Sequence, residues 1–295
     1  MKNDRKKILH LRTHTEQLKT SHPLSRNLKL HISPCPNDTF IFDALLNGRI
    51  DSGELSFEVS FADIEQLNET AISGSAHADI CKVSYAMLPQ LTGCWRVLDS
   101  GGALGYGNGP LLVAARDVNP QDGSLRVAVP GEHTTAHCLL KRLFPSLTRT
   151  EFCLFSEIAP RVAAGDFDVG VLIHEGRFTY EKYGLHLIAD LGQAWEETVG
   201  LPLPLGAIMV SAKLPEALQR EINRLVRASV EYAFAHPAAS ADFVRAHAQE
   251  LDPVVAAQHI RLFVNDYSLS LGSEGRRAIA ELTGISDPHI FVGCE

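Results

Sequence analysis

The sequence predicts an α/β protein of two lobes with a cleft between them, and three observations lead to this prediction. Up to residue 211, short apolar runs alternate with helical patterns, which is typical of α/β folds. Beyond residue 213 the pattern becomes helical. The glycine-rich stretch 101–110 runs into the apolar run LLVAA, and the stretch 201–211 is again an apolar run interrupted by glycine and proline.

If both of these stretches are hinge strands, they divide the chain into two lobes. Residues 111–205 then form lobe 2, and residues 28–110 together with 206–295 form a discontinuous lobe 1. A cleft between two lobes is a usual place for a small-molecule site. The length of 295 residues is sufficient for two such units.

The strands are predicted from short apolar runs that are bounded by turn residues or by helical patterns. In chain order they are 28–32, 55–61, 78–84, 96–100, 109–115, 126–130, 151–155, 168–174, 185–191 and 205–211. Helices are predicted between them at 39–47, 63–72, 135–144 and 156–165.

The C-terminal part is predicted to be helical. A long helix follows residue 213, because its apolar residues recur on one face, and His236-Pro237 ends it. That face carries Leu218, Ile222, Leu225, Val226 and Val230. Further helices are expected at about 239–249, 253–265 and 273–283.

The composition excludes several kinds of partner. Lys plus Arg number 27 against 35 Asp plus Glu, a net charge of -8, and no basic stripe is present, so nucleic-acid binding is not expected. No apolar run approaches the ~20 residues of a membrane helix. The six cysteines form no CxxC pair, which favours reduced thiols in a cytoplasmic protein. The oligomeric state stays open.

The first 27 residues are basic and polar. They lack the apolar core of a secretory signal, so the sequence predicts a disordered extension there.

The stretch SPCPNDTF, residues 33–40, places many polar side chains at a strand-to-helix turn. Free N–H groups at the start of the helix would attract an anion, with Ser33 and Asn37 beside them. The alternative is plain capping by Asn37 or Asp38. Cys35 is interpreted as a packed turn residue in preference to a nucleophile, because no histidine is adjacent in sequence to activate it.

A second such turn lies in VPGEHTTAH, residues 129–137. Thr134 and Thr135 fall where a helix starts, so they either cap it or bind a carboxylate or phosphate. His133 and His137 are four residues apart, a spacing that binds metals on a helix, but no third ligand is evident. No metal site is therefore predicted.

Two further strands end in chemically interesting residues. The run 78–84 leads to Lys82, Val83 and Ser84, where the lysine and the serine could bind an anion, although a solvated lysine is the commoner case. The strand 168–174 ends at His174, which is either a general base or a hydrogen-bonded core histidine.

Together these segments closely resemble the 1,4-dihydroxy-6-naphthoate synthases of the futalosine route to menaquinone. The resemblance extends from about residue 28 to the C-terminus. It rests on SPCPNDTFIFDALLNG, ICKVSYAML, VAVPGEHTTAHCLL, VLIHEGRFTY, LPLPLGAI and HIRLFVNDYSLSLG.

The resemblance implies a two-lobed fold like that of type II periplasmic binding proteins. It implies a lyase that breaks the carbon skeleton of the anionic substrate cyclic dehypoxanthinylfutalosine, releases the sugar-derived fragment and needs no cofactor. His174 would be the catalytic base. The substrate-binding residues would be Ser33, Asn37, Lys82, Val83, Ser84, Thr134 and Thr135. Two alternatives remain: a non-catalytic solute-binding protein and the related chorismate dehydratase.

Overall fold

The computed structural model describes residues 26–74, 77–248 and 252–293. The predicted N-terminal extension therefore lies outside the described residues except at its end. Arg26 and Asn27 belong to strand β1 (Arg26–Ile32), so this strand begins two residues earlier than predicted.

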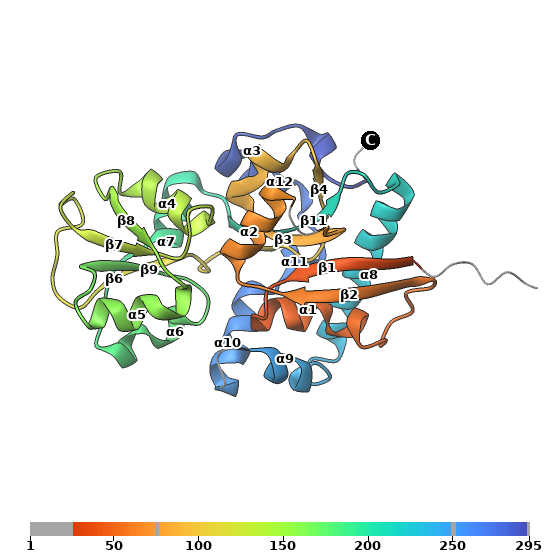
Figure 1. Cartoon of the computed structure of the whole chain (residues 1–295), viewed down its shortest axis with the longest axis horizontal. Coiled ribbons are helices and arrows are strands. Elements are labelled where there is room, and N and C mark those ends of the chain that lie inside the picture. The colour runs from red at the N-terminus through yellow and green to blue at the C-terminus, as the bar shows by residue number, and fades with distance from the viewer. Residues whose placement is uncertain (1–25, 75–76, 249–251, 294–295) are drawn as a thin grey trace, which may run out of the picture.

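Two sheets form the framework, and Figure 1 shows them in two separate lobes. Lobe 1 contains the first sheet, in the order β2-β1-β3-β11-β4, with β5 also pairing with β11. The strands β1, β2 and β3 run parallel, and β11 is antiparallel to β3. Their bounds are β2 Leu55–Phe61, β3 Ile80–Ser84, β4 Trp95–Val97, β5 Ala103–Gly105 and β11 Leu203–Ser211.

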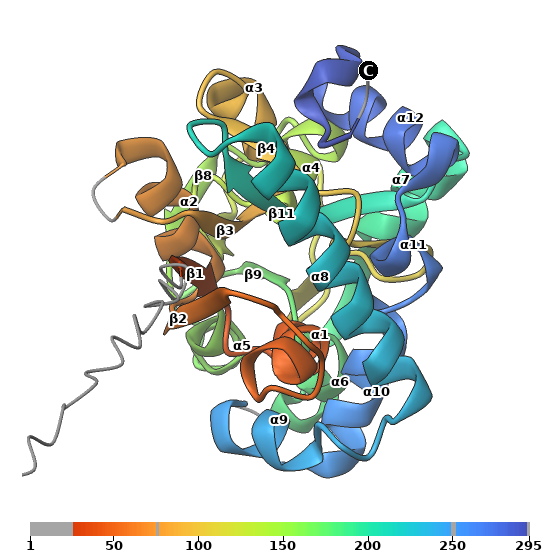
Figure 2. The same ribbon diagram turned by 90° about the vertical axis from the view of Figure 1, so that its right-hand side faces the viewer.

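Helices cover both faces of the lobe 1 sheet. Successive strand residues point to opposite faces, and the side chains on both faces are buried against helices. Ile80 packs in the cluster that includes helices α1 and α8, whereas its neighbour Cys81 packs in the cluster that includes α2 and α12. Helix α1 also contacts α9 and α10, beside α8 in Figure 2. The bounds are α1 Pro36–Leu46, α2 Ile64–Ser73, α8 Glu216–Ala235, α9 Ala241–His247, α10 Pro253–Phe263 and α12 Gly272–Thr283.

Lobe 2 contains the second sheet, in the order β10-β6-β9-β7-β8. Helices α4 and α7 pack on one face of this sheet, and α5 packs on the other. The strands are β6 Leu111–Ala114, β7 Arg126–Val129, β8 Arg149–Phe152, β9 Val169–Leu172 and β10 His186–Asp190. The helices are α4 Thr135–Leu143, α5 Phe155–Ala163 and α7 Leu191–Val199.

All ten predicted strands are confirmed, with boundary errors of a few residues, but some short elements were not predicted. Helix α7 was missed because it begins directly after β10, where Asp190 caps it. The predicted strand 185–191 therefore overran the helix start. The other unpredicted elements are β5, η1 Tyr85–Met87, α3 Leu88–Leu91, α6 Gly176–Thr179, η2 Tyr180–Tyr183, α11 Asp266–Leu269 and η3 Pro288–Ile290.

The lobe boundaries at residues 110/111 and 205/206 stay a prediction. Strands β5 and β6, on either side of residue 110, belong to different sheets, and the chain returns to the lobe 1 sheet through β11. Within the described part of the chain, no helix is long and apolar enough to cross a membrane.

Candidate active site

A cavity lies between the two lobes and is lined by residues from both. About 670 Å³ of space free of protein atoms lies there, part of it open to solvent. Of the predicted site residues, the structure brings Ser33, Asn37, Lys82, Ser84, Thr134, Thr135 and His174 to this cavity. It does not bring Val83 there: the Val83 side chain is fully buried in the core of lobe 1, since alternate residues of β3 face opposite sides.

The turn SPCPNDTF does not use Asn37 or Asp38 as a helix cap, so the capping interpretation is wrong. The N-cap residue of α1 is Cys35, and no side chain makes a cap hydrogen bond. Asp38 turns back instead: its Oδ2 accepts from Ser33 Oγ at 2.6 Å and from Ser33 N at 3.2 Å. Its Oδ1 accepts from Asn37 Nδ2 at 2.8 Å. The polar residues of this turn therefore organise one buried carboxylate.

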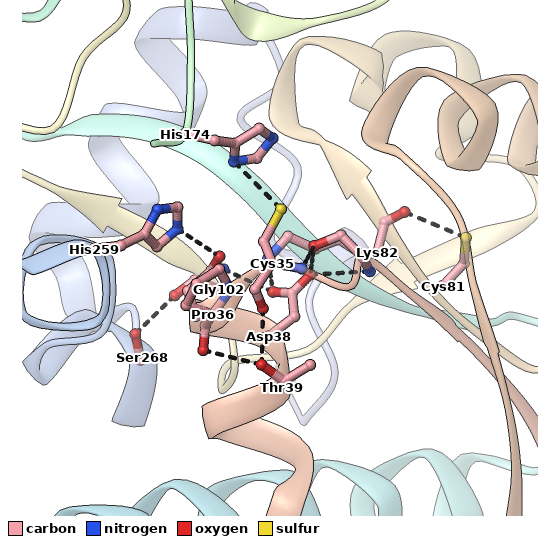
Figure 3. A network of polar contacts seen from close by, with 12 residues as sticks. Cys35, Pro36, Asp38, Thr39, Cys81, Lys82, Gly102, His174, His259 and Ser268 are labelled. Atoms are coloured by element: carbon pink, nitrogen blue, oxygen red, sulfur yellow. Dashed lines mark hydrogen bonds and ion pairs between the residues drawn. The ribbon is translucent and has the colours of Figure 1, made fainter. Parts of the chain in front are cut away.

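Lys82 is the counterion of that carboxylate. Its Nζ lies 2.6 Å from Asp38 Oδ1, and both side chains are almost fully buried (Figure 3). A buried charge is tolerated only when it is paired and hydrogen-bonded, as here. The expectation that Lys82 is exposed to solvent, the commoner case, is therefore wrong. Ser33 and Asn37 both donate hydrogen bonds to Asp38, so the ion pair also helps to fix these two cavity residues.

Ser84 reaches the cavity from the end of β3 and is held by Asn68 of α2. Asn68 Nδ2 donates to Ser84 Oγ at 3.0 Å, and Ser84 N donates to Asn68 Oδ1 at 2.8 Å. Both side chains are buried. These two hydrogen bonds fix the orientation of the Ser84 side chain within the protein itself.

Thr134 and Thr135 bring the N-terminus of α4 to the cavity. Thr134 is the N-cap, and its Oγ1 accepts from His137 N at 3.2 Å, so capping at this position is confirmed. Thr135 Oγ1 donates to Leu205 O at 2.9 Å, which ties α4 to the start of β11. Capping and ligand binding are compatible here, because the helix N-terminus faces a cavity.

His174 occupies a strained position at the end of β9. Among the described residues other than glycine, it alone has a positive φ, 53°. Such a conformation is uncommon for residues with a Cβ and is retained where surrounding structure enforces it. Burial is the main cause that lowers the pKa of His174 to about 4; the charge of Lys82 also lowers this pKa, and that of Asp38 opposes the shift. The imidazole is therefore neutral at neutral pH.

Two lobe 1 residues contact the His174 ring, and sequence reasoning did not place either there (Figure 3). Cys35 Sγ lies 3.6 Å from His174 Nδ1. The ring of His259, from α10, stacks on His174 with centroids 5.9 Å apart, and its Nε2 lies 2.9 Å from Asn37 Oδ1. The only sequence signal was that Cys35 lies in SPCPNDTFIFDALLNG and His259 in HIRLFVNDYSLSLG, two of the segments that carry the resemblance to the synthases.

Asn108 and Arg177 also line the cavity and were not predicted. Arg177 is held by the Gly109 carbonyl and by Asp190, whose Oδ2 lies 2.7 Å from Nη2. Its charge is thus already paired, and it ties the stretch between β5 and β6 to lobe 2. Its place in HEGRFTY was the signal that could have identified it.

The two histidines with metal-like spacing have other partners. His133 Nδ1 lies 2.7 Å from Glu65 Oε1, and His137 Nδ1 lies 3.0 Å from Glu132 O. In the described ranges, no group of three or more His, Cys, Asp or Glu side chains is arranged to hold a metal ion.

Glu65 forms a latch between the lobes. From the first turn of α2 in lobe 1, its carboxylate accepts from both N and Nδ1 of His133 in lobe 2. Asn68 Nδ2 lies 3.5 Å from Glu65 Oε2 and also contacts Ser84. The latch is therefore linked to a cavity residue through one side chain.

Fold and cavity define a class of protein: two-lobed, binding-protein-like molecules that enclose a small ligand. The ligand-binding component of an ABC-type import system from Staphylococcus aureus has this fold, with a TM-score of 0.65 at 14% identity over 90% of this chain and 96% of that one. The solved structure of protein AF1704 from Archaeoglobus fulgidus has a TM-score of 0.82 at 32% identity, over 87% and 95% of the two chains.

The chain belongs to the menaquinone biosynthesis family, whose profile matches residues 28–287. It is 48% identical over 255 residues to the 1,4-dihydroxy-6-naphthoate synthase of Thermus thermophilus, which covers 86% of this chain and 92% of the relative. It is 46% identical over 261 residues to the enzyme of the same name from Streptomyces coelicolor, which covers 86% and 91%.

Proposed function

We propose that this chain is a lyase that converts cyclic dehypoxanthinylfutalosine to 1,4-dihydroxy-6-naphthoate and releases the sugar-derived fragment, in menaquinone biosynthesis. Its similarity to two relatives named 1,4-dihydroxy-6-naphthoate synthase supports this function. The observation that carries the proposal is a histidine with a lowered pKa in a largely apolar cavity, whose wall also carries hydroxyl and amide groups. The cytoplasmic location stays a prediction.

The anionic part of the substrate is proposed to bind at the N-terminus of α4. The helix dipole and the first-turn N–H groups favour a carboxylate there, with the hydroxyl groups of Thr135 and Ser84 nearby in the cavity wall. The net charge of -8 gives no long-range attraction to an anion, so local donors must provide recognition. Arg177 and Lys82 are already paired within the protein.

His174 is proposed to start the fragmentation by accepting a proton from the substrate. A neutral imidazole can act in this way, and the gain of an aromatic ring in the product favours the reaction. The two lobes enclose the cavity, which limits the access of water to the reactive intermediate.

The function is tested by incubating the purified protein with cyclic dehypoxanthinylfutalosine and following the naphthoate product by absorbance and mass spectrometry. We expect turnover. Recovery of unchanged ligand after tight binding would instead support the solute-binding alternative, which the fold also permits. Dehydration of chorismate, with no naphthoate formed, would identify the related dehydratase.

The pH dependence should show the low pKa of His174. Because the neutral imidazole is the active form, kcat/KM should rise with pH through about 4 and then stay level. At about pH 5.5 we expect nearly the value at pH 7.5, whereas an ordinary pKa of about 6.5 would give a loss of about tenfold. Folding is checked in parallel, because the free energy of unfolding falls as pH drops from about 6.5 towards 4, where only the unfolded chain binds a proton at His174.

Replacement of Glu65 by alanine should weaken the latch between the lobes. We expect KM to rise about tenfold with a smaller change in kcat, because one charge-assisted contact contributes roughly 1.5–3 kcal/mol and is not rebuilt by water in full. Glu69→Ala is the matched control, since Glu69 is exposed on the same helix. Equal KM values for the Glu65→Ala and Glu69→Ala variants would contradict a role of this latch in binding.

A further inference from the structure

The two ring nitrogens of His174 have different surroundings. Nδ1 lies 3.6 Å from Cys35 Sγ (Figure 3). Nε2 is buried and has no hydrogen-bond partner among the described residues. The side chain belongs to the cavity wall. Nδ1 therefore has a neighbour within the protein that can share its hydrogen bond, whereas Nε2 has none among the described residues.

The state of the Cys35 thiol limits what it does at Nδ1. Burial is the main cause that raises its pKa well above the usual value, and the charge of Glu175 acts in the same direction. Cys35 is therefore a neutral thiol and not a nucleophilic thiolate. A neutral thiol is both a weak donor and a weak acceptor, so two arrangements with His174 are conceivable.

The two arrangements differ in which nitrogen can act as a base. If S–H donates to Nδ1, the ring proton sits on Nε2, where it would be a buried N–H without a partner. If Nδ1–H donates to sulfur, the lone pair of Nε2 is free to accept a proton. Orphaned buried N–H groups are rarer than under-used acceptors, so the second arrangement is favoured.

Two aromatic contacts hold the orientation of the His174 ring. Phe155 packs edge-on at 4.9 Å between centroids, and His259 stacks on a face. His259 Nε2 donates to Asn37 Oδ1, since the amide nitrogen of Asn37 is used by Asp38. Burial is the main cause that lowers the pKa of His259 well below its usual value, and the proximity of His174 and Lys82 acts in the same direction, so His259 adds no charge beside His174.

We propose that Cys35 is a positioning residue that accepts the Nδ1–H of His174 and so makes Nε2 the nitrogen that takes the substrate proton. The inference rests on the proposed role of His174 as the base. The proton passes from substrate to Nε2, while Nδ1 keeps its own proton and donates it in a hydrogen bond to the Cys35 sulfur. Because Cys35 belongs to lobe 1 and His174 to lobe 2, this arrangement is complete only when the lobes are together.

The tautomer is tested directly by NMR of the protein labelled with 15N-histidine, with the His174 signals assigned from their loss in His174→Gln. We expect a protonated Nδ1 and an unprotonated Nε2 in the wild type. The opposite tautomer would overturn the proposal. This readout needs no turnover, so it separates failure of the proposal from failure of the proposed function, which would show as a lack of product from the wild type.

Kinetics of Cys35 variants supply the second test. Cys35→Ala should lower kcat about tenfold with KM unchanged, because the base then samples the unproductive tautomer, whereas Cys35→Ser retains an acceptor and should stay within about threefold of the wild type. Cys81→Ala is the control, since Cys81 is equally buried but faces the core and does not line the cavity. Unchanged kcat in Cys35→Ala, or equal losses in the alanine and serine variants, would overturn the proposal.

Discussion

Replacement of His174 by alanine is expected to lower kcat by about 10²–10⁴-fold, the usual contribution of a general base. Binding of the substrate should change little, because the groups proposed to hold its carboxylate belong to other elements, α4 and β3. The measurement is steady-state turnover of cyclic dehypoxanthinylfutalosine beside calorimetric binding to the inactive variant. Added imidazole should restore part of the rate, since the substitution leaves a space of matching shape.

An exposed histidine provides the control for this substitution. His186→Ala, on strand β10, removes an exposed imidazole that does not line the cavity and should keep wild-type kinetics. If His174→Ala turns over as fast as His186→Ala, His174 is not the base. The family membership would stand in that case, and the search for the base would move to another cavity residue.

Replacement of Lys82 by methionine is expected to lower the free energy of unfolding by about 3–5 kcal/mol, because it leaves the Asp38 carboxylate buried without its counterion. Denaturant unfolding followed by circular dichroism measures this loss. Lys141→Met is the control, since Lys141 is exposed on α4 and its substitution should change stability by less than about 0.5 kcal/mol.

A double substitution separates the pair from the packing around it. In Asp38→Asn with Lys82→Met, no unpaired charge remains, so much of the lost stability should return. Activity should not return, because Ser33 and Asn37 both depend on the Asp38 carboxylate for their orientation. A stability loss in Lys82→Met no larger than in Lys141→Met would show that the ion pair is not important for folding.

The contacts that cross between the lobes connect binding to catalysis. Glu65 with His133, and Cys35 with His174, each join lobe 1 to lobe 2. The first contact is proposed to hold the lobes together, and the second to orient the base. We propose that closure of the two lobes on the ligand completes the catalytic group in the same movement.

The sequence by itself determined most of the strands, the longer helices of lobe 1 and much of the cavity wall. Alternating apolar runs predicted the strands, because burial on one or both faces of a sheet imposes that pattern on the chain. Thr134 indicated a helix start that the structure confirms. Such signals are local: capping, turn chemistry and periodicity involve residues a few positions apart.

Only the tertiary structure decided how the cavity residues act on one another. The Asp38–Lys82 pair, the Cys35–His174 contact and the His259–Asn37 hydrogen bond join residues that lie 44, 139 and 222 positions apart. No local pattern specifies such partners, because strand order and lobe packing bring them together. Burial then sets their chemistry: loss of water lowers the pKa of His174, raises that of Cys35 and makes a counterion necessary for Asp38.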